Sequence, residues 1–183
     1  MHADIHVFTF KAGLLARVAH DLRLHVQRHA LQVSAGKVRG HCEADSLIVD
    51  GVMTERGLDR AGLSDKDKLT IRETVRREIL HSDVHPRIEL EGDVSADASR
   101  GTIEVRGTLR VRGRSSAVHL QLQRRGDQLQ GAFELTPSEL GIPPYKALGG
   151  AIKLQDRVRV EVTIALEGRD PQVLLAEAQT LQP

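Results

Sequence analysis

The chain has 183 residues, of which 28% are charged, and its formal net charge of +1 provides no overall field that would attract nucleic acid or an anionic membrane. Only 2% of the residues are aromatic, with three Phe, one Tyr and no Trp, so the stacking surfaces of proteins that bind single-stranded nucleic acid are missing. The single cysteine excludes an intrachain disulfide and is compatible with a reducing compartment.

We expect one domain over residues 1–170, followed by a C-terminal tail over residues 171–183. The N-terminus carries no basic segment followed by an apolar run, so we predict no signal peptide. No apolar stretch is long enough to span a bilayer. We therefore expect a cytoplasmic protein, or a periplasmic one if the chain was trimmed.

The N-terminal third predicts three strands, because apolar and polar residues alternate along it. The first strand covers about residues 4–10, and a short apolar helical turn follows over residues 13–21. The second strand begins at Leu22 and continues past a kink at residues 28–29. A turn then leads to a third strand over about residues 37–53.

One helix is predicted at about residues 64–80, after a loop over residues 54–63. Ser64 is suited to the N-cap, with a carboxylate three residues later. Glu73 and Arg77 have the spacing of an ion pair on the wet side. The apolar stripe consists of Ile71, Val75 and Ile79. A stripe this narrow favours a helix lying on the outside or across one end of a sheet.

The remainder of the chain is predicted to be almost entirely strand. The expected strands lie near residues 88–90, 102–112, 118–122, 129–135 and 157–168. Short turns between neighbours are typical of an antiparallel meander. A Pro- and Gly-rich loop over residues 137–156 precedes the last strand, and a loop of this length is often functional.

These elements predict a mainly β fold, an eight-stranded antiparallel up-and-down barrel with a short N-terminal helical turn and one helix at about 64–80. Closure removes the exposed edges of the sheet. A barrel of eight strands is just wide enough to be filled by side chains or to hold one small ligand. The pattern alone leaves both alternatives open.

Polar side chains give little sign of catalysis or metal binding. The nine histidines lack the spacing of a metal ligand set: His2 and His6 would lie about 13 Å apart on a strand. Cys42 and His41 point to opposite faces of their strand. We therefore predict no metal, no cofactor and no catalytic residues. The pair His20-Asp21 is expected near one rim of the barrel, where His20 either bonds a ligand head group or caps the turn.

Several segments together resemble the YceI-like family, a lipocalin-like group named for binding polyisoprenoid lipids. The matching segments are Gly13-Leu14-Leu15-Ala16-Arg17-Val18-Ala19-His20-Asp21-Leu22, Ser46-Leu47-Ile48-Val49-Asp50, Leu63-Ser64-Asp65-Lys66-Asp67-Lys68 with Ile79-Leu80, His85-Pro86-Arg87-Ile88-Glu89-Leu90, Val105-Arg106-Gly107-Thr108-Leu109-Arg110-Val111-Arg112-Gly113, and Pro137-Ser138-Glu139-Leu140-Gly141-Ile142. None of them is a catalytic signature. Leu22, Leu90 and Leu140 stand where the family often has Phe.

The resemblance implies an eight-stranded lipocalin-like barrel with an apolar tunnel for a long isoprenoid or acyl chain. The expected wall residues are Phe8, Phe10, Leu22, Leu24, Val49, Ile88, Leu90, Leu109, Leu120, Leu122, Phe133, Val160, Val162 and Ile164. His20, Tyr145 and Lys146 are the polar candidates at the mouth.

Three functions are compatible with the sequence. The first is non-catalytic binding of a long-chain lipid or isoprenoid-like small molecule inside the barrel. The second is a filled barrel that acts through its outer surface or the 137–156 loop, and the third is an enzyme that uses His20 and Asp21. We expect no nucleic-acid partner and no transmembrane segment, and a homodimer is compatible with the sequence.

Overall fold

The computed structural model describes residues 3–12, 20–97, 100–147, 149 and 152–166, and within them the chain is mainly β. The strands are β1 (Ala3–Lys11), β2 (Asp21–Val26), β3 (His29–Ser34), β4 (Lys37–Glu43), β5 (Leu47–Thr54), β6 (Gly57–Asp59), β7 (Arg87–Asp97), β8 (Thr102–Val111), β9 (Arg114–Arg125), β10 (Gln128–Leu135), β11 (Lys146–Ala147) and β12 (Ile152–Ala165). The predicted helical turn falls mainly on residues 13–19 and the predicted tail on residues 171–183, both outside the described residues.

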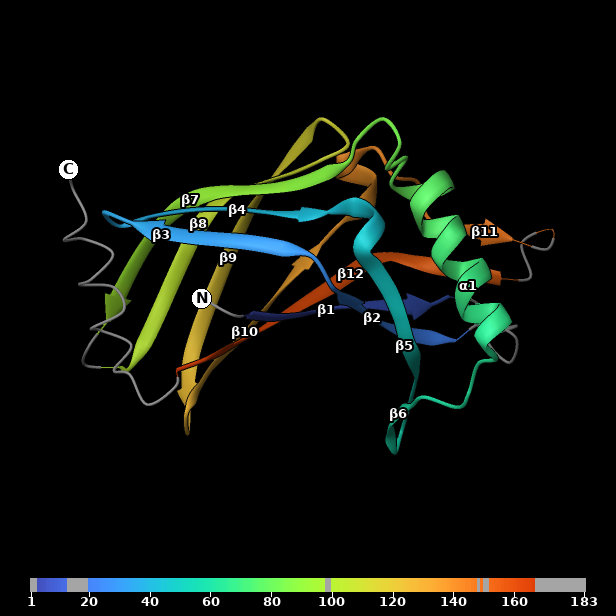
Figure 1. Cartoon of the computed structure of the whole chain (residues 1–183), viewed down its shortest axis with the longest axis horizontal. Helices are drawn as coiled ribbons and strands as arrows, with labels where there is room; N and C mark the ends of the chain where they lie inside the picture. Colours follow the sequence, from blue (N-terminus) through green and yellow to red (C-terminus); the bar gives the residue numbers. More distant parts are fainter. Residues whose placement is uncertain (1–2, 13–19, 98–99, 148, 150–151, 167–183) are drawn as a thin grey trace.

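All strands belong to one curled antiparallel sheet (Figure 1). The strand order is β3-β4-β7-β8-β9-β10-β12-β1-β2-β5-β6, and β11 pairs with β12. The pair β3-β4 at one end of this order is continuous in the chain with the pair β2-β5 near the other end. Strand β2 leads directly into β3, and β4 leads directly into β5, so the two pairs form one long bent hairpin. The sheet therefore returns on itself, and the predicted antiparallel barrel architecture is confirmed.

The predicted number of strands is wrong, since the sheet has twelve strands instead of eight. Two of the extra strands arise where long predicted strands bend. The second strand breaks at the predicted kink, where Gln27 N donates to Ser46 O over 3.1 Å. The third breaks at a 3₁₀ turn over Ala44–Ser46. The other two, β6 and β11, are short pairings within segments predicted as loops.

The predicted 137–156 loop is shorter and more ordered than expected. It contains a 3₁₀ turn over Pro137–Leu140, and β11 pairs antiparallel with the start of β12. The last strand already begins at Ile152, five residues before the predicted start. The sheet is not hydrogen-bonded along its full length. Strand β1 pairs with β2 only over His6–Thr9, and the described pairings of β3 are with β4 alone.

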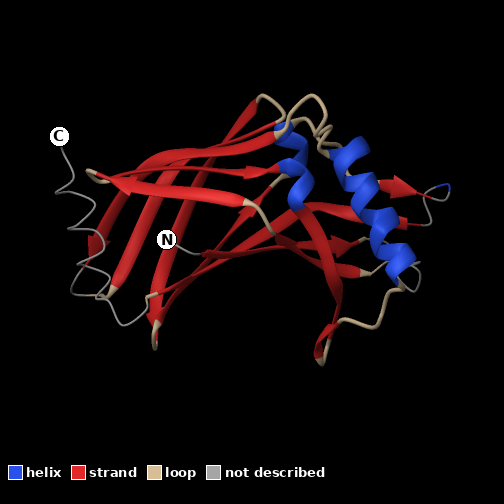
Figure 2. Cartoon of the chain, viewed as in Figure 1, coloured by secondary structure: helices blue, strands red, loops and turns tan. Residues whose placement is uncertain are grey.

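Helix α1 (Asp65–Thr74) continues into one π-helical segment, Val75–Ile79, and lies across one end of the curled sheet (Figure 2). The predicted N-cap is confirmed: the Ser64 hydroxyl oxygen accepts from Asp67 N over 3.1 Å. The predicted ion pair is also present, with 3.0 Å between Arg77 Nε and Glu73 Oε2. No helix among the described residues is long and apolar enough to cross a membrane.

Two glycines allow β7 and β8 to approach closely in the middle of the meander. Gly92 and Gly107 are direct cross-strand partners. A Cβ added to Gly107 would lie 2.3 Å from Glu91 O and 2.9 Å from Gly92 Cα. Only residues without a Cβ fit such an approach, and glycine kinks of this kind introduce the curvature by which a sheet curls.

Candidate ligand-binding cavity

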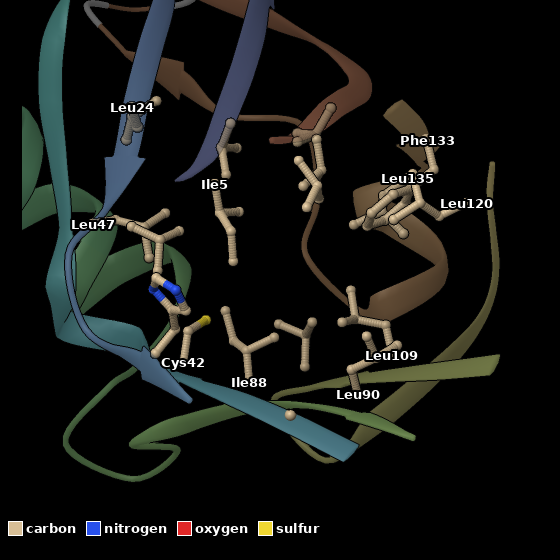
Figure 3. A pocket seen from close by; sticks show the side chains of 18 of the residues that line it. Ile5, Leu24, Cys42, Leu47, Ile88, Leu90, Leu109, Leu120, Phe133 and Leu135 are labelled. Atoms are coloured by element: carbon tan, nitrogen blue, oxygen red, sulfur yellow. The ribbon is translucent and has the colours of Figure 1, made fainter. Parts of the chain in front are cut away.

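The curled sheet and the helical segment line a partly open cavity of about 330 Å³. Its wall is almost wholly aliphatic, and side chains from opposite sides of the sheet point toward a common empty centre (Figure 3). Cavities that hold small ligands fall at about 300–1,000 Å³. An engineered apolar cavity of about 150 Å³ already stays dry and binds benzene. The space is therefore large enough for one slender apolar molecule.

Most of the predicted wall residues line this cavity. They are Leu24, Ile88, Leu90, Leu109, Leu120, Leu122, Phe133, Val160, Val162 and Ile164, and the predicted mouth residue Tyr145 joins them. Their alignment follows from the register, in which Leu90 of β7 is the direct partner of Leu109 of β8. Cross-strand partners share a face, so an inward residue on one strand places its partner inward as well.

Phe8 and Phe10 do not line the cavity. The lining residues of β1 are Ala3, Ile5, Val7 and Thr9. Successive side chains of a strand point to opposite faces, so Phe8 lies on the outer face. The ring of Phe10 packs against the guanidinium of Arg157, 4.2 Å from its centroid.

Four further predicted site residues also lie away from the cavity wall. Leu22 and Val49 are not among the lining residues, although they belong to an apolar cluster that includes both the lining residue Leu24 and Ile71 of α1. His20 is exposed just before β2, and Lys146 is exposed on β11.

The helical segment supplies one end of the cavity wall, which the sequence pattern did not reveal. Val75 and Ile79 line the cavity, and Leu80 beside them is buried. Leu80 N donates to Val75 O over 2.8 Å, the longer spacing of a π-helix. The turn between β8 and β9 holds this end in place, since Arg112 Nη1 donates to Ile79 O over 3.1 Å. Two of the three stripe residues predicted from the sequence thus face the cavity.

Polar groups in the wall are few. Thr9 Oγ1 is buried and has no hydrogen-bond partner. His29 and Cys42 are cross-strand partners that both line the cavity. Burial raises the pKa of the Cys42 thiol to about 11, so this side chain is a neutral thiol at physiological pH.

Arg157 is the one Asp, Glu, Lys or Arg among the described lining residues. It lies at the rim, and its guanidinium is already occupied. One face stacks on Phe10, and Nη1 lies 3.3 Å from Glu134 Oε1. The described wall thus offers an apolar surface with a few hydroxyl, imidazole, thiol and carboxamide groups, the last from Gln155.

A separate polar cluster lies on the outer face of β1, β2 and β5. His6 and His25 are cross-strand partners whose rings stack 5.1 Å apart. Asp50 has only 9% of its side chain exposed, and its carboxylate accepts a 2.8 Å hydrogen bond from Arg23 Nε. Burial, followed by the charge of Arg23, lowers the pKa of His6. The histidine spacing along one strand did not show this pairing, because it joins two strands.

The described residues hold no group of three or more His, Cys, Asp or Glu side chains that could bind a metal. Asp21 Oδ1 accepts a 2.7 Å hydrogen bond from Lys11 N and so ties β2 to the end of β1. Because His20 is exposed and lies outside the cavity wall, the pair His20-Asp21 does not face the enclosed space.

Comparison with known proteins identifies the fold. No family model and no curated protein matches the chain. The solved structure of Burkholderia cenocepacia BcnA matches with a TM-score of 0.59 and 12% identity, over 88% of this chain and 94% of that one. A polyisoprenoid binding domain from Saccharophagus degradans, implicated in plant cell wall breakdown, matches with a TM-score of 0.57 and 10% identity, over 88% and 91%. The chain therefore has the fold of these proteins, and the lipocalin-like antiparallel architecture implied by the YceI-like resemblance is confirmed, although not its eight strands.

Proposed function

We propose that the chain binds one long-chain apolar or amphiphilic molecule, an isoprenoid or acyl lipid, inside the curled sheet, and that it acts by binding rather than by catalysis. The observation that carries this proposal is the aliphatic cavity of about 330 Å³, closed at one end by Val75 and Ile79. The fold shared with a polyisoprenoid binding domain adds support.

The chemistry of the wall is sufficient for such a ligand. Each buried methylene contributes about 0.8 kcal/mol, so ten of them supply about 8 kcal/mol before the costs of association. Recognition would then depend on the length and width of the ligand's hydrocarbon chain. A filled barrel, the second function compatible with the sequence, is disfavoured by the open space between Leu90, Leu109 and Phe133.

Native mass spectrometry of the purified protein, followed by organic extraction, tests the proposal directly. We expect a bound species of lipid mass that dissolves into the organic phase. A protein that runs at its bare mass and takes up no long-chain ligand from an added lipid extract would refute it.

A matched pair of variants locates the site. Leu109→Trp adds a large ring to the cavity wall, whereas Thr108→Trp adds the same ring to the exposed outer face of the same strand. We expect the first variant to lose the ligand and the second to keep it. Equal binding by both folded variants would place the ligand elsewhere.

A further inference from the structure

The described cavity wall suits an uncharged ligand, because it offers few groups that could stabilise an ionised one. Taking a carboxylate or phosphate out of water is costly unless a cation or several donors replace the water. Arg157, the single Lys or Arg in the described wall, already contacts Phe10 and Glu134 at the rim. In the part of the wall that the structure describes, a buried anion would therefore have no free Lys or Arg as counter-charge, and only the imidazoles of His29 and His41 as other groups that can become cationic.

One buried group does call for a polar partner. Thr9 Oγ1 is shielded from solvent and makes no hydrogen bond, although buried hydroxyl groups nearly always make one. Thr9 lines the cavity, and its cross-strand partners Val158 and Leu22 are aliphatic. It lies beside the register shift between Thr9 and Lys11, and irregular strand positions of this kind often re-aim a side chain next to a site. A ligand oxygen is the partner that this hydroxyl lacks.

We propose that the cavity selects an uncharged isoprenoid or acyl chain that carries an oxygen able to hydrogen-bond Thr9, and that it rejects ionised lipids such as carboxylates and phosphates. This inference rests on the proposed function and narrows it to neutral lipids such as alcohols, esters or quinones.

Three acyclic ten-carbon isoprenoids with the same skeleton test it: myrcene, a hydrocarbon, geraniol, an alcohol, and geranate, a carboxylate. Their affinities are measured by displacement of a neutral fluorescent probe at about pH 8.5, where free imidazoles are uncharged and carboxylates are ionised. Delipidated full-length protein is compared with Thr9→Val, which keeps the shape and removes the hydroxyl, and with Thr9→Ser, which keeps the hydroxyl.

We expect the wild-type protein to bind geraniol at least about 100-fold more tightly than geranate. Thr9→Val should weaken geraniol binding by roughly three- to tenfold and leave myrcene unchanged, whereas Thr9→Ser should preserve geraniol binding. Binding of geranate as tight as that of geraniol would overturn the inference. So would equal losses for myrcene and geraniol in Thr9→Val.

The two proposals fail in different ways. If myrcene and geraniol bind, but geranate binds as tightly as geraniol or Thr9→Val does not weaken geraniol binding, the inference fails while the proposed function stands. If no compound displaces the probe and no lipid is extracted from the purified protein, the proposed function fails and the inference fails with it.

Discussion

Replacing Gly107 by Ala should destabilise the fold, because the backbones of β7 and β8 approach closely at this position. The new Cβ would lie 2.3 Å from Glu91 O, about 1 Å closer than ordinary contact allows. The obstacle is backbone, so no side-chain rotation relieves it. The strands must separate at the Gly92–Gly107 pair, which strains the neighbouring ladder hydrogen bonds.

The expected cost follows from opposing contributions. Overpacking costs about 1–3 kcal/mol, and a weakened ladder hydrogen bond costs about 0.5–1.5 kcal/mol. Replacing Gly with Ala also reduces the entropy of the unfolded chain, which offsets about 0.4–1 kcal/mol. The balance is a net loss of about 0.5–4 kcal/mol, which at about 2–4 °C per kcal/mol lowers the Tm of a chain of this size by about 1–16 °C.

Thermal and urea unfolding, followed by circular dichroism, measure this loss. Thr108→Ala is the matched control, since Thr108 is the exposed neighbour on the same strand and should change the free energy of unfolding by less than about 0.5 kcal/mol. If Gly107→Ala unfolds at the same or a higher temperature than the wild type, the close approach of β7 and β8 is not required for the fold.

Three other predictions concern separate features. Ser64→Ala should lower the free energy of unfolding by about 1 kcal/mol because α1 loses its N-cap, whereas Ser64→Asp should keep the wild-type stability. Equal stability of all three proteins in urea would show that the Ser64 cap does not stabilise the fold. Cys42 should react slowly with a polar thiol reagent at pH 8 because its pKa is about 11, and unfolding in urea should speed the reaction; fast labelling of the folded protein would refute this. Because the pKa of His6 is lowered in the folded protein, the unfolded chain protonates His6 at a higher pH, and the free energy of unfolding should fall as the pH drops through 6.5. Urea titrations of His6→Gln should show a smaller fall. A fall as large as that of the wild type would exclude His6 as the cause.

The alternation of apolar and polar residues carries most of the information about the wall. It identifies which residues of a strand share a face, and short turns then fix the register of the meander, so Leu90 and Leu109 are predicted to share a face. It does not decide which face of a strand is inside when both are apolar. In β1, Ile5 and Val7 alternate with Phe8, and it is Ile5 and Val7, not the expected wall residue Phe8, that line the cavity.

Contacts between distant segments explain the other differences. Phe10 does not line the cavity and packs against Arg157, which lies far from it in the sequence. Likewise, the stripe on α1 predicts an apolar surface beneath the helix but not that Val75 and Ile79 close a cavity. Thr9 shows no signal in the sequence, because its missing hydrogen bond is visible only in the structure.

The scarcity of aromatic side chains explains why the cavity remains open. Phe133 and Tyr145 are the aromatic rings among the described lining residues, and most of the others are aliphatic. Branched side chains such as Val160 and Ile164 have few rotamers with which to fill the space, and the ladders hold the strands apart.

An empty cavity of 330 Å³ would be costly to maintain. At about 24 cal/mol per Å³ the cost is about 8 kcal/mol, comparable with the whole stability of a typical domain, about 5–15 kcal/mol. A bound lipid restores the van der Waals contacts that the wall of an empty cavity lacks. The protein as purified should therefore unfold at a higher temperature than after delipidation, and re-addition of the extracted lipid should raise the unfolding temperature again. Calorimetry measures both states. Equal unfolding temperatures would mean that the walls collapse onto one another once the ligand has left.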